Sequence, residues 1–193
     1  LHVSTDEVYG SIRHGSHNEE NKLNPKNPYS ATKASAEHLI RSYANTYGVE
    51  YIIVRPSNNF GPRQHSEKFL PTIVRSLKSG KKIPVYGDGS NVRDWLYVKD
   101  NVSAIYHIMK NGKLNQTYNI TRKKELTNLE ICRSVCEILE KDPDKSIEFI
   151  DDRLGHDFRY SITNDKLKSI GFESKILFKD ALKETVQSLW EKE

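Results

Sequence analysis

The chain has 193 residues, 36% of them hydrophobic and 29% charged, and a formal net charge of +4. This composition is typical of an ordinary soluble protein that can bury a core. The lysine and arginine residues are scattered along the chain, which argues against a nucleic-acid partner. The sequence contains no apolar run of about 18 residues and no signal-peptide pattern, so we expect neither membrane insertion nor secretion, and we place the protein in the cytoplasm.

The first residues have the pattern of a buried strand's end. Residues 1–3 lead into Ser4 and Thr5, and two consecutive carboxylates follow, Asp6 and Glu7. No glycine-rich loop of the form Gly-x-x-Gly-x-x-Gly or Gly-x-Gly-x-x-Gly occurs downstream. The sequence therefore looks like the C-terminal part of a longer protein.

A surface loop and a helix are expected next. Residues 11–28 are polar and show no periodicity, as in a surface loop. Pro28 gives a start signal and Gly48 a stop signal for a helix over about residues 30–47.

Tyr29 and Lys33 stand four residues apart at the start of this helix, and residues at that spacing share one face. The Lys33 charge can therefore favour the Tyr29 phenolate. A tyrosine with a reference pKa of about 10 must fall by roughly three units to act as a base near neutrality, which is about 4 kcal/mol of differential stabilisation. A bound cationic cofactor ring would add to the effect of one lysine. This is a first indication of a nicotinamide enzyme.

The Tyr-x-x-x-Lys spacing is weak evidence by itself, because Tyr106 and Lys110 repeat it in an amphipathic run with no polar cluster before it. We interpret that second pair as a solvated helix face. What distinguishes Tyr29 is the hydroxyl and the two carboxylates that precede it in the chain.

Residues 50–55 are dense in β-branched side chains and end at Pro56, which predicts a short buried strand. A strand end, a helix and a buried strand in succession are typical of a parallel α/β sheet. The polar run 57–63 follows the carboxyl end of this strand, where open parallel sheets bind their ligands.

The remaining chain alternates short strands and helices, which suggests a second, smaller lobe interleaved with the first. Cys132 and Cys136 fall four residues apart in a helical pattern, where a disulfide would be strained and a metal would lack further ligands, so we expect reduced packing residues and no metal site. We expect helices over 67–79, from a cap at Asp100 to Met109, from a cap at Thr127 to Leu139, over 165–170 and over 179–191, and strands over 82–89, 94–98, 117–120 and 147–150.

These segments together resemble the extended short-chain dehydrogenase/reductase superfamily and, within it, the dTDP-glucose 4,6-dehydratases. The resemblance covers nearly the whole chain and implies an α/β fold, the C-terminal part of a Rossmann-type parallel sheet with an interleaved smaller α/β substrate lobe. It rests on residues 4–10, 29–33, 57–62, 67–68, 93–98, 118–120 and 152–157. Residues 1–57, about 92–116 and 163–175 would belong to the NAD-binding Rossmann domain, and about 58–91, 117–162 and 176–193 to the nucleotide-sugar lobe.

The consecutive Asp6 and Glu7 favour a dehydratase among these relatives. In related epimerases serine and small residues follow the hydroxyl, and related decarboxylases have serine in place of Asp6. Dehydration needs a general acid and a general base besides the redox tyrosine. The resemblance implies that Tyr29 and NAD oxidise C4 of a nucleotide-linked hexose, with Thr5 and Lys33 assisting. Glu7 would then remove the C5 hydrogen while Asp6 protonates the departing C6 hydroxyl, and reduction at C6 would give the 4-keto-6-deoxy sugar.

The resemblance also implies contacts to NAD and to a nucleotide-sugar substrate. Arginine suits a diphosphate because its planar fork can bond two phosphate oxygens. For single members of the set, such as Asn128 and His156, a helix cap or a surface charge remains an alternative. The residues expected at NAD are Ser4, Tyr29, Lys33, Ser57 and Asn59, and those expected at the substrate are Asn58, Lys68, Tyr86, Arg93, Asn128, Arg153, His156 and Tyr160.

Three further expectations concern the whole protein. The helix that bears Tyr29 would contribute to a homodimer, as in relatives. Without the strands that would precede residue 1, a parallel sheet would expose an apolar edge. The alternatives are another nucleotide-sugar epimerase, decarboxylase or dehydratase, or an inactive fragment without its cofactor loop that serves as an interaction module.

Overall fold

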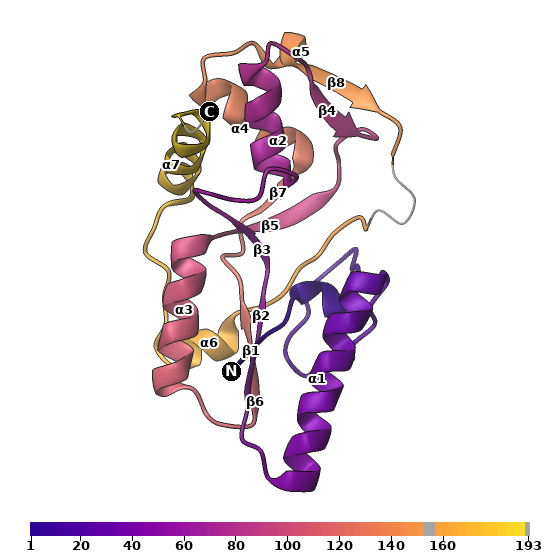
Figure 1. Ribbon diagram of the computed structural model, residues 1–193, viewed down its shortest axis with the longest axis vertical. Coiled ribbons are helices and arrows are strands. Elements are labelled where there is room, and N and C mark those ends of the chain that lie inside the picture. The colour runs from indigo at the N-terminus through magenta and orange to yellow at the C-terminus, as the bar shows by residue number, and fades with distance from the viewer. Residues whose placement is uncertain (153–156, 192–193) are drawn as a thin grey trace.

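The computed structural model describes residues 1–152 and 157–191 of the chain. Figure 1 shows an elongated molecule with two groups of elements arranged end to end along its long axis. The lower group is built around a parallel sheet, and the upper group consists mainly of helices. The first residues of the chain lie in the lower group, and the last helix lies in the upper group.

A three-stranded parallel sheet forms the centre of the lower group. Its strands are β1 (His2–Val3), β2 (Ile52–Pro56) and β6 (Gln116–Ile120), in the order β1-β2-β6. Every residue of β2 is buried, as expected for a strand with a neighbour on each side and helices on each face. Its β-branched residues Ile52, Ile53 and Val54 therefore supply core packing on both faces of the sheet.

Helices cover both faces of this sheet, as Figure 1 shows. On one face lies α1 (Pro28–Tyr47), and on the other lie α3 (Val98–Asn111) and α6 (Asp165–Ser169). The short 3-10 turn η1 (Asp6–Tyr9) follows β1 and packs against α1. Parallel strands with helices on both faces confirm the expected Rossmann-type α/β architecture.

The upper group has its own apolar core between helices and short strands. The core includes Phe60, Leu70, Trp95, Ile131 and Val186, all buried. In one sheet β5 (Val92–Tyr97) pairs in parallel with β3 (Asn58–Phe60) and antiparallel with β7 (Glu125–Thr127). In a second sheet β4 (Ile83–Tyr86) pairs in parallel with β8 (Ile147–Ile150). The helices of this group are α2 (Phe69–Lys78), α4 (Asn128–Ile138), α5 (Pro143–Ser146) and α7 (Phe178–Glu191).

The helix that carries Tyr29 begins and ends where the sequence predicts. Asn27 forms a capping box with Ser30, and Pro28 occupies the first position, where its missing amide donor costs nothing. Gly48 ends the helix in the left-handed conformation with φ 70°, which glycine adopts without strain. These local signals place Tyr29 in the first turn of α1.

The other expected elements are present, with ends that differ by a few residues, and one expected cap is wrong. Thr127 caps α4 in a capping box with Glu130, as predicted. Asp100, expected to cap α3, instead lies inside its first turn, because the chain passes directly from β5 into α3 at Val98. Asp100 is buried, with its Oδ2 atom 3.7 Å from Nη1 of Arg122.

Two smaller expectations are also settled by the fold. Cys132 and Cys136 are free and fully buried in the upper core, which confirms them as reduced packing residues, and burial raises the pKa of Cys132 to about 12. Tyr106 is 62% exposed with the Lys110 ammonium 5.7 Å from its ring centroid, which confirms that the second Tyr-x-x-x-Lys pair is a solvated helix face.

The strand pairing bears on the expected division into lobes. That division assigned residues 117–162 to the nucleotide-sugar lobe, but β6 pairs with β2 along its whole length. Residues 116–120 therefore lie in the central sheet, where β6 is the strand next to β2 in the order β1-β2-β6. We propose a lobe boundary after Ile120 in place of residue 116, and otherwise retain the division as a proposal.

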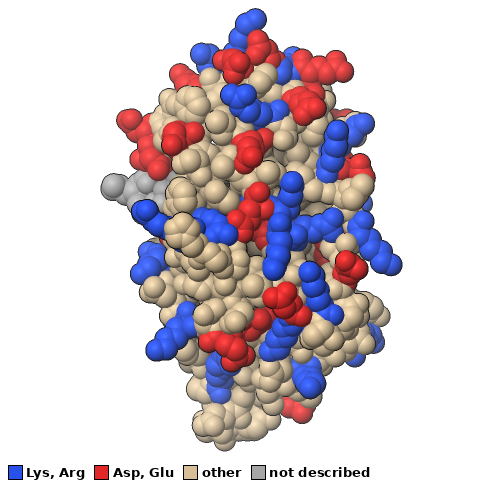
Figure 2. Space-filling model, turned by 180° about the vertical axis from the view of Figure 1, so that it is seen from behind, with Lys and Arg blue, Asp and Glu red and all other residues tan. Residues whose placement is uncertain are grey.

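Charged side chains of both signs are distributed over the face drawn in Figure 2, where lysine and arginine residues alternate with acidic ones. One exposed pair of this kind joins Lys99 and Glu184, with Nζ and Oε1 2.6 Å apart. Within residues 1–152 and 157–191, none of the helices has the length and apolar character needed to span a bilayer.

Candidate functional site

The turn η1 carries the two consecutive carboxylates directly after β1. Thr5 caps this turn, since its Oγ1 atom accepts a hydrogen bond of 3.3 Å from the Glu7 amide. The same hydroxyl donates to Oδ1 of Asp6 at 3.3 Å. From the loop before α1, Nδ2 of Asn27 donates to Oε2 of Glu7 at 3.2 Å. The turn therefore holds both carboxylates against the start of α1.

The Tyr29 phenol lies beside this turn. Partial burial raises the pKa of Tyr29, and the nearby Glu7 and Asp6 carboxylates raise it further. A hydrogen bond with the Thr5 side chain acts in the opposite direction on the same pKa. These influences come from groups close to the phenol, so the structure brings Tyr29, Thr5, Asp6 and Glu7 into one cluster.

Lys33 contacts the strand that precedes the turn. Its Nζ atom donates a 2.7 Å hydrogen bond to the carbonyl oxygen of Val3 on β1. Burial is the largest cause of the raised pKa of Tyr29, followed by the Glu7 carboxylate. The effect of the Lys33 charge on the Tyr29 phenolate, together with a bound cofactor ring, stays a prediction.

Burial sets the pKa of the Asp6 carboxyl group well above its ordinary value. The side chain is 2% exposed, and its Oδ2 atom has no hydrogen-bond partner among the described residues. Burial raises the pKa of Asp6 to about 8, with further contributions from the Glu7 and Asp94 carboxylates. The Thr5 hydroxyl and the Arg93 guanidinium oppose this shift. A carboxyl group that is still protonated at neutral pH can serve as a general acid.

The raised pKa of Asp6 predicts a stability that depends on pH. The folded chain retains a proton on Asp6 between its ordinary pKa of 3.8 and about 8. The contribution of this proton to the free energy of unfolding is fully present below about pH 4 and is lost as the pH rises to about 8. Over that range the free energy of unfolding falls by up to about 1.4 kcal/mol per pH unit. Asp6→Asn cannot lose this proton, so it should reduce the fall in unfolding free energy across that range. Urea denaturation at about pH 5 and pH 8 gives the unfolding free energy of each protein at both pH values. An equal fall in unfolding free energy for the unaltered protein and for Asp6→Asn would contradict the prediction.

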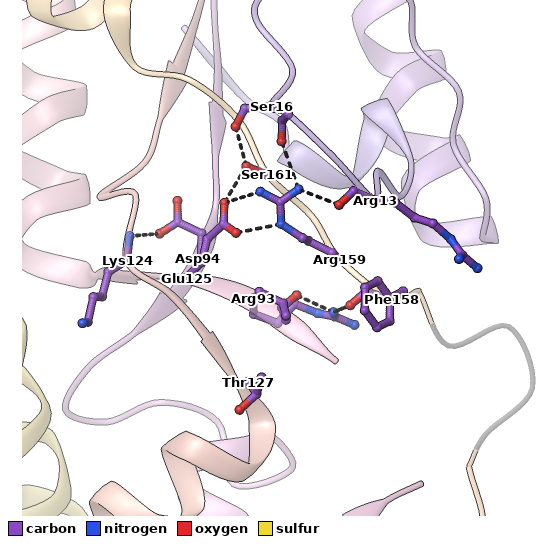
Figure 3. Close-up of polar contacts among 12 residues, drawn as sticks. Arg13, Ser16, Arg93, Asp94, Lys124, Glu125, Thr127, Phe158, Arg159 and Ser161 are labelled. Carbon is purple, nitrogen blue, oxygen red and sulfur yellow. Dashed lines mark hydrogen bonds and ion pairs between the residues drawn. The ribbon is translucent and has the colours of Figure 1, made fainter. Parts of the chain in front are cut away.

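Arg93 acts on the pKa of Asp6 and also contacts the segment around Phe158, and Figure 3 shows the second of these contacts. Its Nη1 and Nη2 atoms donate to the carbonyl oxygens of Phe158 and Asp157 at 3.2 and 2.8 Å. The guanidinium lies 5.0 Å from the ring centroid of Tyr160. Burial raises the pKa of Tyr160, and so do its hydrogen bond to Asp157 and the Glu7 carboxylate. Two predicted substrate residues, Arg93 and Tyr160, therefore lie next to the predicted acids.

A second polar network in Figure 3 fixes the loop after η1. Arg159 makes a bidentate ion pair with Glu125, with Nε to Oε2 at 2.7 Å and Nη2 to Oε1 at 2.9 Å. Its Nη1 atom donates to the carbonyl oxygen of Gly15 at 3.0 Å. Ser161 donates to the same Glu125 at 2.6 Å and lies 2.7 Å from the Ser16 hydroxyl. This network ties the polar loop to β7 beside Arg93.

The polar run after β2 offers unsatisfied acceptors for a bound group. The Oδ1 atoms of Asn58 and Asn59 are buried and have no hydrogen-bond partner among the described residues. Asn59 donates through Nδ2 to the carbonyl oxygen of Ser57 at 2.9 Å, which fixes the direction of its amide. Buried acceptors normally have partners, so these residues at the carboxyl end of β2 suit a ligand that carries hydroxyl or amide donors, as a dinucleotide does. Ser4, also predicted near the cofactor, is buried at the end of β1.

Other predicted substrate residues lie on separate elements of the upper group. Lys68 is exposed and precedes α2, Tyr86 is 41% exposed on β4, and Asn128 is the first residue of α4. Arg153 and His156, which were predicted to bind the substrate, lie outside the described residues.

The sequence interpretation missed three buried charged residues around the site. Glu37 follows Lys33 by four residues on the same face of α1, and Arg55 is the only charged residue of β2. The sequence contains a feature that could have indicated each of these two residues. Glu37 is a carboxylate on the helix face that also carries Tyr29, and Arg55 is a cation in an otherwise apolar strand. Asp94, which follows Arg93, is 1% exposed and lies close enough to Asp6 to raise its pKa.

Comparison with known proteins agrees with this architecture. The model of the NAD dependent epimerase/dehydratase family matches residues 1–121. Low-salt glycan biosynthesis protein Agl12 of Haloferax volcanii is 47% identical over 96% of this chain and 60% of its own length. The dTDP-glucose 4,6-dehydratase of Haemophilus influenzae is 40% identical over 96% of this chain and 59% of its own length.

Solved structures give the same result. The dTDP-glucose 4,6-dehydratase of Streptomyces venezuelae, with NAD and TYD bound, superposes with a TM-score of 0.95 and 41% identity, over 98% of this chain and 59% of that one. The corresponding enzyme of Bacillus anthracis, in complex with NAD, has a TM-score of 0.92 and 45% identity. The chain thus spans about 60% of the length of the relatives it matches. Since the family model covers more than half of the chain and the predicted resemblance is confirmed, this chain belongs to the NAD-dependent epimerase/dehydratase family.

Proposed function

We propose that the protein dehydrates a nucleotide-linked hexose, with dTDP-glucose as the substrate and a 4-keto-6-deoxy sugar as the product. The observation that carries this proposal is the cluster of Tyr29, Thr5, Asp6 and Glu7, in which a phenol lies beside one protonated acid and a second carboxylate. Oxidation and water elimination on one sugar ring need a redox base, a proton donor and a proton acceptor. The cluster contains one group suited to each task.

The proposed roles combine the positions of the four groups with the raised pKa of Asp6. Tyr29 takes the proton of the C4 hydroxyl, and Thr5 steadies that oxygen. The resulting 4-keto group acidifies the C5 hydrogen, which Glu7 then removes. Asp6, protonated at neutral pH, donates its proton to the departing C6 hydroxyl and so releases water. Burial of Asp6 suits this role, because the proton is retained until the leaving group develops negative charge.

NAD is the proposed cofactor, and the residues present fit it. When bound, it would accept a hydride from C4 and return one to C6. Ser4, Tyr29, Lys33, Ser57 and Asn59 would hold the nicotinamide end, and the unsatisfied Oδ1 atom of Asn59 is the observation that favours a donor-bearing group there. Lys33 donates to the Val3 carbonyl oxygen at the end of β1, directly before Ser4.

The proposed nucleotide-sugar contacts extend from the acids into the upper group. Arg93 and Tyr160 lie next to the acids and would face the diphosphate. Lys68, Tyr86 and Asn128, together with Asn58, Arg153 and His156, remain proposed contacts to the nucleotide and diphosphate. Arginine is suited to this position because one guanidinium can bond two phosphate oxygens.

Incubation with dTDP-glucose and NAD tests the function. We expect a 4-keto sugar, detected by its absorbance in alkali, and a product lighter than the substrate by one water in mass spectrometry. A product of unchanged mass with an inverted hydroxyl would instead identify an epimerase. Turnover of UDP-glucose in preference to dTDP-glucose would identify a dehydratase for a different nucleotide. If neither substrate reacts while NAD binds, the protein is an inactive member of the family.

We further propose a homodimer through α1. Leu39, Tyr43 and Tyr47 follow one another at spacings of four on this helix and are 61, 56 and 71% exposed. Residues at this spacing share a face, so they form an apolar stripe that a second copy could cover. Light scattering after gel filtration should give twice the chain mass, and Tyr43→Glu should shift it to one chain mass. A single chain mass for the unaltered protein would refute the dimer.

A further inference from the structure

A buried ion pair connects the helix of the phenol to the central sheet. Arg55 on β2 is 2% exposed and Glu37 on α1 is fully buried. The pair is bidentate, with Nε to Oε1 at 2.9 Å and Nη2 to Oε2 at 2.5 Å. Two parallel hydrogen bonds fix the relative orientation of their planes as well as their separation. The helix is thereby held to the strand at one defined position.

The same guanidinium also holds the turn of the carboxylates. The Nη1 atom of Arg55 donates to the hydroxyl of Tyr9 at 2.5 Å, and this hydroxyl donates to Oδ1 of Asn119 on β6 at 2.8 Å. The Arg55 guanidinium lies 4.7 Å from the Tyr9 ring centroid, and the ring stacks on His17 at 5.1 Å. Tyr9 is the last residue of η1, so this end of the turn is fixed from two strands.

These anchors lie on the elements that carry the proposed catalytic groups. Glu37 follows Tyr29 by eight residues and Lys33 by four, so all three share one face of α1. Tyr9 follows Asp6 by three residues, and in a 3-10 turn residues three apart lie one above the other. Fixing Tyr9 therefore fixes the rotation of the turn about its axis, and with it the direction of the Asp6 side chain.

We propose that Arg55 is a positioning residue, which through Glu37 and Tyr9 sets the approach of the Tyr29 phenol to the Asp6 and Glu7 carboxylates. The catalytic part of this inference rests on the proposed function, whereas the geometric part does not. A guanidinium is suited to the task because it presents donors in two directions within one plane, toward Glu37 and toward Tyr9. A lysine at the same position could not satisfy both partners in this geometry.

Tyr9→Phe separates positioning from simple core packing. The variant keeps the aromatic ring against Arg55 and His17 and removes only the hydroxyl between Arg55 and Asn119. Tyr118→Phe is the matched control, because Tyr118 is also buried, and its hydroxyl accepts a hydrogen bond from the Lys113 amide at 2.8 Å, away from the network. Both variants lose a buried tyrosine hydroxyl, but only the first loosens η1.

The readout is the pKa of Asp6, followed by NMR of its labelled side-chain carboxyl carbon. The groups that face Asp6 are Thr5 and Glu7 from its own turn, Arg93 and Asp94 from β5 and Tyr29 from α1, and all five side chains are unchanged in both variants. Loosening the turn should admit water and lower this pKa from about 8 by about one unit, which is a tenfold change in acidity. Tyr118→Phe should leave it in place. An Asp6 pKa that is the same in the two variants would overturn the proposal.

A kinetic readout adds a second test. Tyr9→Phe should lower kcat more than tenfold with little change in KM, since the acids would be misplaced while the nucleotide contacts remain. Arg55→Lys should likewise lower kcat and the pKa of Asp6, because a positive charge without the two-directional donors of arginine does not position the turn. If Arg55→Lys leaves both kcat and the pKa of Asp6 unchanged, the guanidinium has no positioning role. If the pKa moves as expected but no substrate is dehydrated by the unaltered protein, only the proposed function fails.

Discussion

Replacing Glu7 with glutamine is expected to stop water loss while C4 oxidation continues. Glutamine has the same length and the same planar end group as glutamate, but its amide cannot accept the C5 proton. Removal of a general base typically costs a factor of about 10² to 10⁴ in rate. In the proposed mechanism oxidation depends on Tyr29 and Thr5, and the substitution leaves both residues in place. The variant should therefore form the 4-keto sugar and reduced nicotinamide, without release of the 6-deoxy product.

Two measurements on one reaction mixture check this expectation. Absorbance of the reduced nicotinamide follows oxidation, and mass spectrometry of the sugar nucleotide follows the loss of water. Glu20→Gln is the matched control, since it makes the same change to an exposed carboxylate in the polar loop. The control should turn over at the rate of the unaltered protein. Unchanged dehydration by the Glu7 variant would refute its role as the base, and loss of oxidation as well would mean that it is needed earlier.

Replacing Arg55 with methionine is expected to give the largest loss of stability. The substitution leaves the Glu37 carboxylate buried at 0% exposure, with its bidentate partner gone. Removal of one partner from a buried ion pair costs about 3–5 kcal/mol, because an uncompensated charge stays in a low dielectric. The Tyr9 hydroxyl loses its donor as well. Urea denaturation should show a lower midpoint with an unchanged slope.

The exposed pair of Lys99 and Glu184 supplies the control for this prediction. Its side chains are 58 and 46% exposed, so solvent screens the charges although Nζ and Oε1 are 2.6 Å apart. Lys99→Met should therefore cost no more than about 1 kcal/mol. A stability loss for Arg55→Met as small as that of Lys99→Met would mean that water reaches Glu37 in the folded chain. It would also remove the basis for the Arg55 anchor.

Local signals in the sequence were sufficient for the elements around the site. Pro28 and Gly48 marked α1, and the β-branched run before Pro56 marked β2, because caps and hydrophobic periodicity act over a few neighbouring residues. The cap expected at Asp100 failed because β5 continues directly into α3, and the packing of that helix on the sheet outweighs a local capping preference.

The candidate site was predictable in its residue types but not in its electrostatics. The order of Thr5, Asp6, Glu7 and Tyr29 along the chain, with the resemblance to a known family, was enough to name the cluster. Burial and the neighbouring Glu7 and Asp6 carboxylates raise the pKa of Tyr29, and these two influences come from the folded arrangement of the chain. The four-residue spacing places Lys33 on the helix face of Tyr29, and only the folded chain shows that its ammonium donates to the Val3 carbonyl oxygen.

By itself, then, the sequence determined the parallel α/β class, the family and the group of acids beside a tyrosine helix. Each of these depends on interactions between residues close in the chain or on a recognisable order of segments. The tertiary structure alone decided that burial raises the pKa of Asp6 and which buried charges hold the elements together. Burial of Asp6 and the pairing of Arg55 with Glu37 arise from segments far apart in sequence, and the dielectric and partners that such contacts create cannot be read from local spacing.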